Sequence, residues 1–370
     1  MRLLICAMEY PPHSDGIGNF VSNIVTHLKN QGLDCKICSP SGPDIKLGSQ
    51  TLIEKYGFFG LLFFWYAVTR HLKSTTYDMI WVHNPYFIFS TPLSRGVVTI
   101  HTTYYGVWFN HVGYFYTLHI YNKIASIIEH YCLHNIDKTT IITCVGKQVF
   151  HELKEIGIDI RRINCIPYNG VDSNRFKPQG NKKELRKKLG IPENDIVLLS
   201  VGRLTPNKRP HVLIDIISIL EKKRGDITLC FAGKGELLDD MRELVKKRGL
   251  KKVIFLGYVD DENLPLLYSC SDYYIMASHY EGAPLTLYEA LASGLSCIVS
   301  DIPSLDLVKQ SDCGIAVNFE NIEESSKTIL AFLSDSHSEQ AKNARDLAIR
   351  ELDWSIITQK YMEIFKRQSV

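Results

Sequence analysis

The sequence has no excess of either charge and no apolar run long enough to cross a membrane. Lys and Arg number 42 against 40 Asp and Glu, so the formal net charge is +2, whereas general nucleic-acid binders are far more basic. The longest apolar stretch, 58–68 (FFGLLFFWYAV), is shorter than the roughly 20 residues of a transmembrane helix. The N-terminus also lacks the long apolar region of a secretion signal. We therefore expect a cytoplasmic protein that binds no nucleic acid.

Patterns typical of metal sites and disulfides are also scarce. The 10 cysteines lie mostly in apolar, strand-like segments, which is typical of small buried side chains in a reducing compartment. The one CxxC, Cys35 and Cys38, falls in an expected strand, where residues three apart point to opposite faces. No second CxxC accompanies it, and no Asp-x-Asp pair occurs where one would serve. The sequence predicts no metal site.

Strand-like and helical segments alternate in two series. Strands are expected at 3–8, 34–39, 79–82, 97–100 and 140–143, and after the turn cluster 168–172 at 196–201, 227–232, 253–256, 273–276, 296–300 and 315–317. Such alternation predicts parallel sheets covered by helices. At roughly 150 residues per domain, we expect one doubly wound domain over 1–172, completed by an amphipathic helix at about 353–370, and a second over 173–352.

The loop after strand 196–201 carries two cations. Gly202 allows a tight turn, and Arg203 and Lys208 follow it before the next helix. Ligands of doubly wound sheets bind at the carboxyl ends of the strands, and two cations there suit a diphosphate. The alternative is that both charges are simply solvated.

The segment 278–289 pairs acidic residues with the start of a helix. Pro284 suits a first helical turn, where free backbone N–H groups favour an anion or a polyhydroxyl ligand; these would be the amides of Ala283, Leu285 and Thr286. Glu281 precedes the helix, and Glu289 lies in an otherwise nearly apolar stretch of it. Carboxylates here could bind sugar hydroxyls, although Glu281 could instead complement the helix dipole.

Two weaker signals lie in the first domain. The glycines of 14–18 (SDGIG) follow the first strand and could admit a phosphate or a sugar, but they do not complete a GxGxxG motif. His101 stands at the carboxyl end of strand 97–100. A lone histidine in such a place is more often structural than functional.

Taken in order, these segments resemble the retaining glycosyltransferases of family 4, which have the GT-B fold. The resemblance covers essentially the whole chain and is most specific over 196–301. It rests on DGIG (15–18), TIHTTYYG (99–106), PYNGVD (167–172), VGRL (201–204) followed by Lys208, and EGAPLTLYEALASG (281–294). It implies an α/β protein of two Rossmann-like doubly wound domains facing each other across a cleft, the first binding the acceptor and the second the nucleotide sugar.

The resemblance also implies roles for single residues. Arg203 and Lys208 would bind the donor diphosphate, Glu281 the transferred sugar and Glu289 the ribose, while His101 would lie near the reacting sugar. The implied catalytic residues are His101, Arg203, Lys208 and Glu281. The implied donor-binding residues are Gly16, Gly202, Arg203, Lys208, Tyr258, Val259, Glu281, Gly282, Ala283, Pro284, Leu285, Thr286 and Glu289. Acceptor contacts are expected from Asp15, Tyr104, Tyr105 and Trp108.

Two positions depart from the family pattern. Asp15 stands where the family often has glycine, which could alter contacts with the acceptor. Arg209 also stands where glycine is common, and we expect its side chain to point to solvent. Neither departure removes a charged residue from the implied site.

The implied activity is a retaining, metal-independent transfer of a hexosyl group from a UDP-, GDP- or ADP-sugar to a hydroxyl of a glycan or a lipid-linked acceptor, with no cofactor. Cations and helix-terminal amides would stabilise the departing diphosphate. The alternatives are a nucleotide-sugar epimerase or hydrolase of the same fold and a non-catalytic sugar-nucleotide-binding protein. A dinucleotide oxidoreductase is disfavoured, because Gly233 and Gly235 have no third glycine at 238.

Aromatic residues are concentrated in the first half of the chain. Residues 1–170 hold 25 of the 39 Phe, Tyr and Trp, chiefly at 56–66 and 104–121. These segments could pack in the core, stack on sugars or enter a lipid surface. We expect the second segment to select the acceptor, and we expect the protein to act at the cytoplasmic face of a membrane if that acceptor is lipid-linked.

Overall fold

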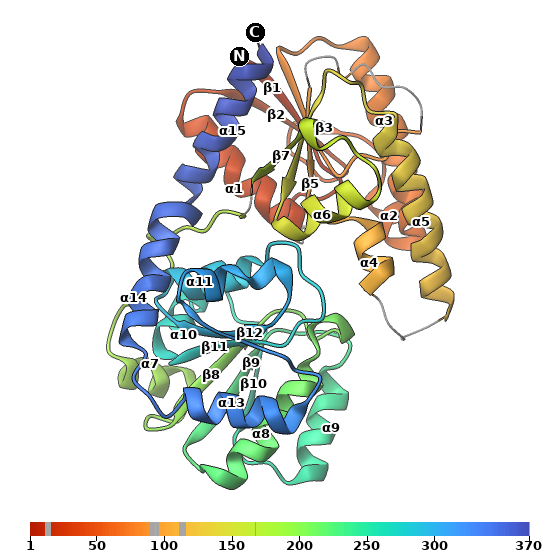
Figure 1. Ribbon diagram of the computed structural model, residues 1–370. Coiled ribbons are helices and arrows are strands. Elements are labelled where there is room, and N and C mark those ends of the chain that lie inside the picture. Colours follow the sequence, from red (N-terminus) through yellow and green to blue (C-terminus); the bar gives the residue numbers. More distant parts are fainter. Residues whose placement is uncertain (12–15, 89–92, 94–95, 111–115, 167, 370) are drawn as a thin grey trace. The chain divides into compact units, whose positions relative to one another are not determined.

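The computed structural model describes residues 1–11, 16–88, 93, 96–110, 116–166 and 168–369. The chain forms two compact units, one of Met1–Gly170 with Trp354–Val370 and one of Val171–Asp353. Each unit is a parallel sheet with helices on both faces (Figure 1). The expected class of two doubly wound α/β domains is therefore confirmed.

The first unit contains a seven-stranded sheet of order β3-β2-β1-β4-β5-β6-β7. Its strands are β1 (Arg2–Cys6), β2 (Asp34–Ser39), β3 (Ile45–Lys46), β4 (Met79–His83), β5 (Gly96–Ile100), β6 (Ile141–Val145) and β7 (Ile163–Ile166). Its helices are α1 (Gly16–Asn30), α2 (Gln50–Tyr56), α3 (Phe58–Ser74), α4 (Tyr104–Asn110), α5 (Tyr116–His134), α6 (Lys147–Glu155) and α15 (Trp354–Ser369), with a 3-10 turn at Ile160–Arg162. The strand order reverses between β1 and β4, the type of position where doubly wound sheets bind ligands.

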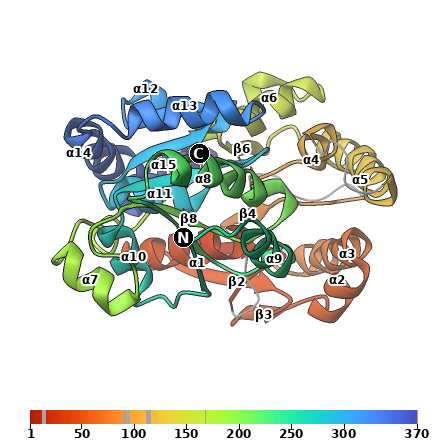
Figure 2. The same cartoon turned by 90° about the horizontal axis from the view of Figure 1, so that it is seen from below.

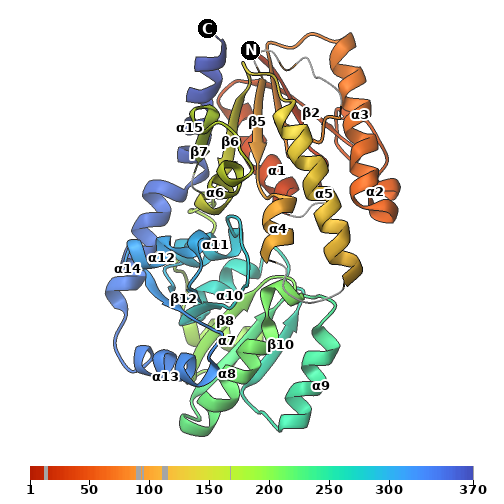
Figure 3. The ribbon, with the colours of Figure 1, turned by 45° about the vertical axis from the view of Figure 1, so that its right-hand side comes forward.

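The two faces of this sheet are covered by different helices. Alternating strand residues such as Leu4 and Val82 pack with the buried sides of α3, α5 and α6. On the other face, α1 lies against α15, and the ring of Phe20 stands 5.4 Å from that of Trp354 and 5.8 Å from that of Tyr361. Figure 3 shows α15, in blue, running beside the first unit. The last helix of the chain is therefore an integral part of the first unit.

The second unit contains a six-stranded sheet of order β10-β9-β8-β11-β12-β13. Its strands are β8 (Ile196–Val201), β9 (Ile227–Ala232), β10 (Val253–Gly257), β11 (Tyr273–Met276), β12 (Ser296–Ser300) and β13 (Gly314–Val317). Its α-helices are α7 (Lys182–Leu189), α8 (Pro210–Lys223), α9 (Leu238–Arg248), α10 (Leu264–Cys270), α11 (Leu285–Ala292), α12 (Leu307–Gln310), α13 (Ile322–Phe332) and α14 (Ser338–Leu347). Short 3-10 turns lie at Pro206–Lys208 and Pro303–Leu305, and a π turn at Ala348–Leu352. Because β8 and β11 are neighbours, the loops that follow them meet at one edge of the sheet.

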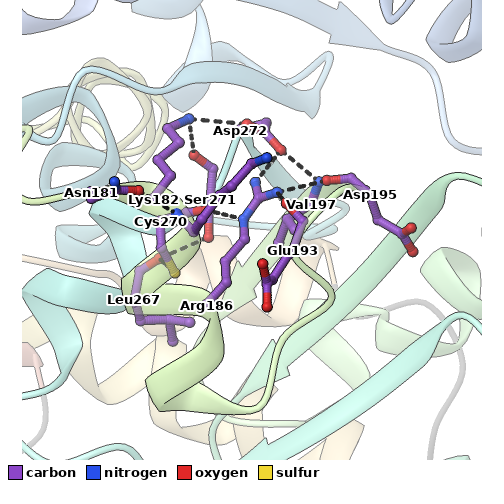
Figure 4. Close-up of polar contacts among 11 residues, drawn as sticks. Asn181, Lys182, Arg186, Glu193, Asp195, Val197, Leu267, Cys270, Ser271 and Asp272 are labelled. Carbon is purple, nitrogen blue, oxygen red and sulfur yellow. Dashed lines mark hydrogen bonds and ion pairs between the residues drawn. The ribbon is translucent and has the colours of Figure 1, made fainter.

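A buried arginine ties α7 to the rest of the second unit (Figure 4). The Arg186 guanidinium donates to the carbonyl oxygens of Cys270, Glu193 and Asp195 at 2.8, 3.0 and 2.8 Å, and to the Asp272 carboxylate at 2.5 Å. Its side chain is only 5% exposed. The charged sequence around it, KKELRKKL, otherwise predicts a solvated helix, so this one side chain explains how α7 docks.

All ten cysteine thiols are free, and all but Cys165 are buried. This confirms the interpretation of the cysteines as small buried side chains. The aromatic stretch 58–68 is the first part of helix α3. Of the described helices, none is both long and apolar enough to cross a membrane.

Candidate functional site

In the second unit, the loops after β8 and β9 lie directly against each other. Gly202 has a φ of 144°, in the region that favours glycine. A Cβ atom on Gly233 would overlap the carbonyl oxygen of Gly202, and one on Gly235 would overlap that of Leu204. Close backbone packing therefore explains Gly233 and Gly235. This agrees with the sequence, in which the two glycines do not complete a dinucleotide-binding motif.

The loop after β8 is also joined to the loop after β11. The Asn207 side-chain amide donates to the Tyr280 carbonyl at 2.9 Å, and the His279 N–H donates to the Asn207 carbonyl at 2.8 Å. These bonds bring Lys208 to Glu281, where Nζ lies 2.5 Å from Oε1. The Glu281 side chain is 9% exposed and that of Lys208 is 29% exposed. A cation and a carboxylate from distant parts of the sequence thus form one charged pair.

A pocket lies beside this pair at the carboxyl ends of β8 and β11. Arg203 and Lys208 contribute to its wall, and Arg203 is exposed. The Ser278 hydroxyl also lines the pocket, is fully buried and has no hydrogen-bond partner among the described residues. The lining residues are Ser200, Val201, Gly202, Arg203, Leu204, Lys208, Pro210, Tyr274, Met276, Ala277 and Ser278. The site therefore offers two cations and an uncommitted hydroxyl, a donor set suited to phosphate oxygens.

The expectation for Arg209 is wrong. Its side chain does not point to solvent: Nη1 lies 2.6 Å from Glu320 Oε1, and Nη2 donates to the Phe319 carbonyl at 3.3 Å. The Arg209 side chain is 15% exposed. Its backbone has a φ of 49°, which glycine adopts without cost. The turn itself therefore explains why a glycine suits this position, and the ion pair accounts for the arginine.

Helix α11 places a partly exposed carboxylate on an apolar helix. The Tyr268 hydroxyl donates to Glu289 Oε2 at 2.9 Å, and burial raises the pKa of Glu289 from 4.5 to about 7. Pro284 caps this helix and stands one residue before it, so α11 begins at Leu285 and not at the proline. Gly282 and Pro284 are buried, and Ala283, Leu285 and Thr286 are half-buried.

An aromatic side chain projects from the loop after β10. Gly257 ends that strand with a φ of 66°, and Tyr258 follows with 70% of its surface exposed. Val259 beside it is half-buried. An exposed ring at the carboxyl end of a strand is suited to stack on a planar ligand.

In the first unit, His101 belongs to a buried histidine pair that the sequence did not predict. Nε2 of His101 lies 2.9 Å from Nδ1 of His83, which ends β4. Burial lowers the pKa of His101 to about 3 and also lowers that of His83. The ring of Phe20 lies 4.8 Å from that of His101. Both imidazoles are therefore neutral at physiological pH.

Asn84 fixes the backbone next to this pair. It has a φ of 46°, its side-chain oxygen accepts from the His101 N–H at 2.7 Å, and its amide donates to the Thr102 carbonyl at 2.8 Å. The loops after β4 and β5 are thereby held together. His83 and Asn84 could have been found only by recognising that β4 and β5 are adjacent strands.

Three of the predicted acceptor residues, Tyr104, Tyr105 and Trp108, lie on α4, which adjoins a buried carboxylate. Glu129 Oε2 accepts from the backbone N–H groups of Tyr104 at 2.7 Å and Tyr105 at 3.3 Å. Burial raises the pKa of Glu129 to about 8. The ring of Tyr104 packs 5.1 Å from that of Phe58, and the Trp108 indole donates to His119 Nε2 at 3.0 Å. The two tyrosines are thus anchored by their backbone.

The remaining predicted residues of the first unit are Gly16 and Asp15. Gly16 begins α1, and a Cβ there would meet no atom within 4 Å. Asp15 lies outside the described residues. Over the described parts of the chain, no three His, Cys, Asp or Glu side chains are grouped so that they could hold a metal ion.

Comparison with protein families gives two matches that together cover most of the chain. The family model "Glycosyl transferases group 1" matches residues 181–349, and the family model "Glycosyltransferase Family 4" matches residues 14–175. The first match contains Arg203, Lys208, Glu281 and Glu289. The second contains His83 and His101.

Similar proteins include two curated enzymes and one solved structure. The UDP-Gal:alpha-D-GlcNAc-diphosphoundecaprenol alpha-1,3-galactosyltransferase of Escherichia coli is 34% identical over 198 residues, covering 52% of this chain and 48% of that protein. The alpha-monoglucosyldiacylglycerol synthase of Streptococcus pneumoniae is 24% identical, covering 83% and 72%. The structure of WaaG, a glycosyltransferase involved in lipopolysaccharide biosynthesis, has a TM-score of 0.78 at 19% identity, covering 98% and 99%. This chain spans about half the length of the first relative.

Proposed function

The chain belongs to the group 1 glycosyltransferases, and from that premise we propose that it transfers a hexosyl group from a UDP-, GDP- or ADP-sugar to an acceptor hydroxyl with retention of configuration. The observation that carries the proposal is the 2.5 Å pair of Lys208 and Glu281 beside Arg203 and the pocket. Such a site combines cations for a departing diphosphate with a carboxylate for sugar hydroxyls. Both features suit the transfer of a sugar from a nucleotide.

The leaving nucleoside diphosphate gains charge as the sugar departs. Arg203 and Lys208 would stabilise that charge, and the buried Ser278 hydroxyl would donate to a phosphate oxygen. Preorganised donors of this kind are each worth a few kcal/mol, roughly 3, in a water-poor site. We propose that these side chains and the amides at the start of α11 perform the charge neutralisation, so that the reaction requires neither a metal ion nor a cofactor.

Two further residues would hold the nucleoside. Glu289 would accept hydrogen bonds from the ribose hydroxyls, with Tyr268 fixing one carboxylate oxygen at 2.9 Å. Tyr258 would stack on the base because its ring is 70% exposed at the edge of the sheet. Donor selection would then depend on the loop after β10, separately from the diphosphate contacts.

The proposed stereochemistry follows from the environment of Glu281. Retention by double displacement needs a carboxylate free to attack the anomeric carbon, but Glu281 is engaged by Lys208 and would bind sugar hydroxyls instead. A front-face displacement is therefore the proposed route. His101, neutral and held by His83, would orient the reacting sugar as a hydrogen-bonding group.

The proposed acceptor is a glycan or a lipid-linked sugar. The support is that one similar enzyme is named for a GlcNAc-diphosphoundecaprenol substrate and another for the synthesis of alpha-monoglucosyldiacylglycerol. We propose that the protein works at the cytoplasmic face of a membrane when its acceptor is lipid-linked. The aromatic residues of α4, including Tyr105 and Trp108, would contact that acceptor.

A donor panel with product analysis tests this proposal. UDP-, GDP- and ADP-sugars are screened by thermal shift, since a ligand that binds the folded state raises its stability. The selected donor is then incubated with lipid-linked and soluble glycan acceptors, and the anomeric configuration of the product is read by NMR. A glycosylated acceptor of retained configuration supports the proposal. A free sugar or an epimer formed equally well without acceptor would replace it with hydrolysis or epimerisation, and donor binding with no turnover would indicate a binding protein.

The matched variant for this panel is Arg203→Ala/Lys208→Ala. We expect it to lose most of the donor-induced thermal shift and most of the transfer. The control is Arg242→Ala/Lys246→Ala on α9, which removes two cations of the same unit that lie outside the pocket. Undiminished transfer by the Arg203/Lys208 variant would overturn the diphosphate assignment.

A further inference from the structure

The exposed apolar side chains of the first unit are not scattered. Fourteen large hydrophobic residues are exposed in the described part of the chain, and nine of them lie on or beside α2, α3 and α5. These nine, named here the α3/α5 surface, are Tyr56, Phe59, Phe63, Tyr66, Ile88, Ile120, Ile124, Ile127 and Tyr131. Single exposed hydrophobic residues are normal, whereas a cluster of this kind marks a contact site.

On each helix the exposed residues form a stripe. Phe59, Phe63 and Tyr66 are 59%, 52% and 46% exposed, at spacings of four and three along α3. On α5, Ile124 and Ile127 are 47% and 62% exposed, and they continue a stripe from Ile120 to Tyr131 at the same helical spacings. Residues three and four apart lie on one side of a helix. Both helices therefore turn an apolar side outward while their opposite sides fill the core.

The two helices are neighbours on the same side of the first unit, as all three ribbon views show (Figure 2). They meet where the Phe58 N–H donates to the Tyr121 hydroxyl at 2.5 Å. Farther along, Tyr86 packs 5.0 Å from Phe58 and donates to Glu129 of α5 at 3.4 Å. The two helices that carry the apolar stripes are therefore in direct contact.

A groove of about 350 Å³ lies along α3. Its walls are Phe59, Leu62, Phe63, Tyr66 and Thr69 from the helix, with Tyr86 and Ile88 opposite. Two of the three hydroxyls in this wall are engaged elsewhere, because Thr69 donates to the Trp65 carbonyl at 2.8 Å and Tyr86 donates to Glu129 at 3.4 Å. The rest of the wall is mainly apolar. It has the chemistry to receive hydrocarbon.

The exposed charges of α3 and α5 have one sign, and on α2 the exposed Glu54 and Lys55 offset each other. The described side chains of α3 and α5 include no exposed Asp or Glu, because the one acid of these two helices, Glu129, is buried. Arg70 and Lys73 continue the aromatic stripe of α3, and Lys123 flanks that of α5. Cations beside exposed aromatic and branched side chains suit an anionic lipid surface.

We propose that the α3/α5 surface docks on a bilayer that contains anionic lipid, with the apolar stripes entering the interface and Arg70, Lys73 and Lys123 contacting headgroup phosphates. A second copy of this chain fits less well, because a two-fold contact places identical surfaces against each other and would oppose these cations. The inference deepens the proposed function, since it gives the protein direct access to a lipid-linked acceptor. Vesicle binding does not require sugar transfer, so this inference and the proposed function can fail separately.

Vesicle flotation of the full chain tests the inference. The probes are phosphatidylcholine vesicles with and without about one-third phosphatidylglycerol, at low and high salt. We expect binding to the anionic vesicles that weakens with salt. Phe59→Ser/Phe63→Ser and Ile124→Ser/Ile127→Ser should each lower the partition coefficient by about tenfold or more. Arg70→Gln/Lys73→Gln should lower it on anionic vesicles and leave the weak binding to neutral vesicles unchanged.

The control variant is Ile160→Ser/Ile349→Ser, which removes two side chains that are 52% and 45% exposed elsewhere on the chain. It should bind vesicles as the wild type does, and circular dichroism should show all variants folded. No binding of wild type to anionic vesicles would overturn the proposal. So would a wild-type dimer in sedimentation that the Phe59/Phe63 variant converts to monomer, because the surface would then join two copies of the chain.

Discussion

His83 and His101 share a single hydrogen bond inside the first unit, with Nδ1 of His83 2.9 Å from Nε2 of His101. Both rings are neutral, because burial lowers both pKa values, so only one of the two facing nitrogens carries a proton. The other nitrogen of His83, Nε2, is buried and has no partner among the described residues. A buried N–H without a partner is rarer in proteins than a buried acceptor without one. His83 therefore donates from Nδ1, and His101 carries its own proton on Nδ1.

This tautomer is a prediction that NMR can check. The nitrogen spectrum of the histidine-labelled protein should show His101 protonated at Nδ1 and unprotonated at Nε2 between about pH 5 and 8. His83→Asn keeps a donor near the position of Nδ1 and should preserve the His101 pattern. His83→Leu removes that donor and should shift His101 toward a mixture of tautomers. A wild-type His101 protonated at Nε2 would contradict the assignment.

The pair of Lys208 and Glu281 gives a second prediction, which concerns stability. Lys208→Met leaves the buried Glu281 carboxylate without its cation, and we expect a loss of about 2 kcal/mol, below the value for a fully buried pair because Lys208 is partly exposed. Lys208→Met/Glu281→Gln removes both charges and should lose less than the single variant. The free energy of unfolding from urea titrations, followed by circular dichroism, measures both. A double variant less stable than the single one would mean that the pair does not interact as described.

Glu289 should make nucleoside binding depend on pH. Its pKa of about 7 means that the carboxyl group is neutral in acid and ionised in base, and only the ionised form accepts two hydrogen bonds from the ribose. Affinity for the nucleoside of the selected donor should therefore rise from pH 6 to 8 and then level off, by at most about tenfold per pH unit. Calorimetry with a nucleoside avoids the phosphate group, which itself titrates near pH 6. Glu289→Gln should bind the nucleoside more weakly, with an affinity that does not change with pH. If the affinity of the wild type were equally independent of pH, Glu289 would not bind the ribose.

The sequence predicted the architecture because strand and helix periodicities are local signals. Strands β8, β9, β11 and β12 occupy the same residues as expected, since each is a mainly apolar run of the length of a strand. Lys208 and Glu281 were identified from the same local reasoning, as polar residues at strand ends. The sequence did not predict that Lys208 and Glu281 pair with each other, because this contact depends on β8 and β11 being adjacent strands.

Other residues gave no signal that sequence reasoning could use. Ser278 and His83 follow apolar strands and look like ordinary strand ends, so their buried, unpartnered atoms become visible only in three dimensions. Arg209 was misjudged because its ion pair with Glu320 spans 111 positions of the chain. The stripe of α5 was missed because isoleucines at helical spacing are equally typical of a buried side.

Glu129 should make the first unit less stable as the pH rises. Its pKa is raised from 4.5 to about 8 in the folded protein. Between these two values the unfolded chain loses the proton while the folded protein keeps it, so the contribution of Glu129 to the free energy of unfolding is complete below about pH 4 and is lost as the pH rises through 8. Glu129→Gln stays neutral and can still accept from the Tyr104 N–H. Relative to the wild type, the variant should gain at least about 1 kcal/mol between pH 5 and 8. Tryptophan fluorescence measures this, because Trp65, Trp81, Trp108 and Trp354 all lie in the first unit.

Because all four tryptophans lie in the first unit, fluorescence and circular dichroism together can test a prediction for the second unit. Arg186→Met leaves the carbonyl oxygens of Cys270, Glu193 and Asp195 without the Arg186 donor and removes one of the two cations beside Asp272, the other being Lys182 (Figure 4). A loss of about 3 kcal/mol is expected, because several buried acceptors lose their partner at once.

Because the second unit has no tryptophan, Arg186→Met should lower the urea midpoint seen by circular dichroism while the fluorescence transition stays in place. Arg242→Met is the matched control: its 3.5 Å pair with Asp239 joins side chains that are 53% and 93% exposed, and exposed pairs contribute little. Equal effects of the two variants would show that the buried contacts of Arg186 do not hold α7. A fluorescence transition that moves with the circular dichroism would show instead that the two units unfold together.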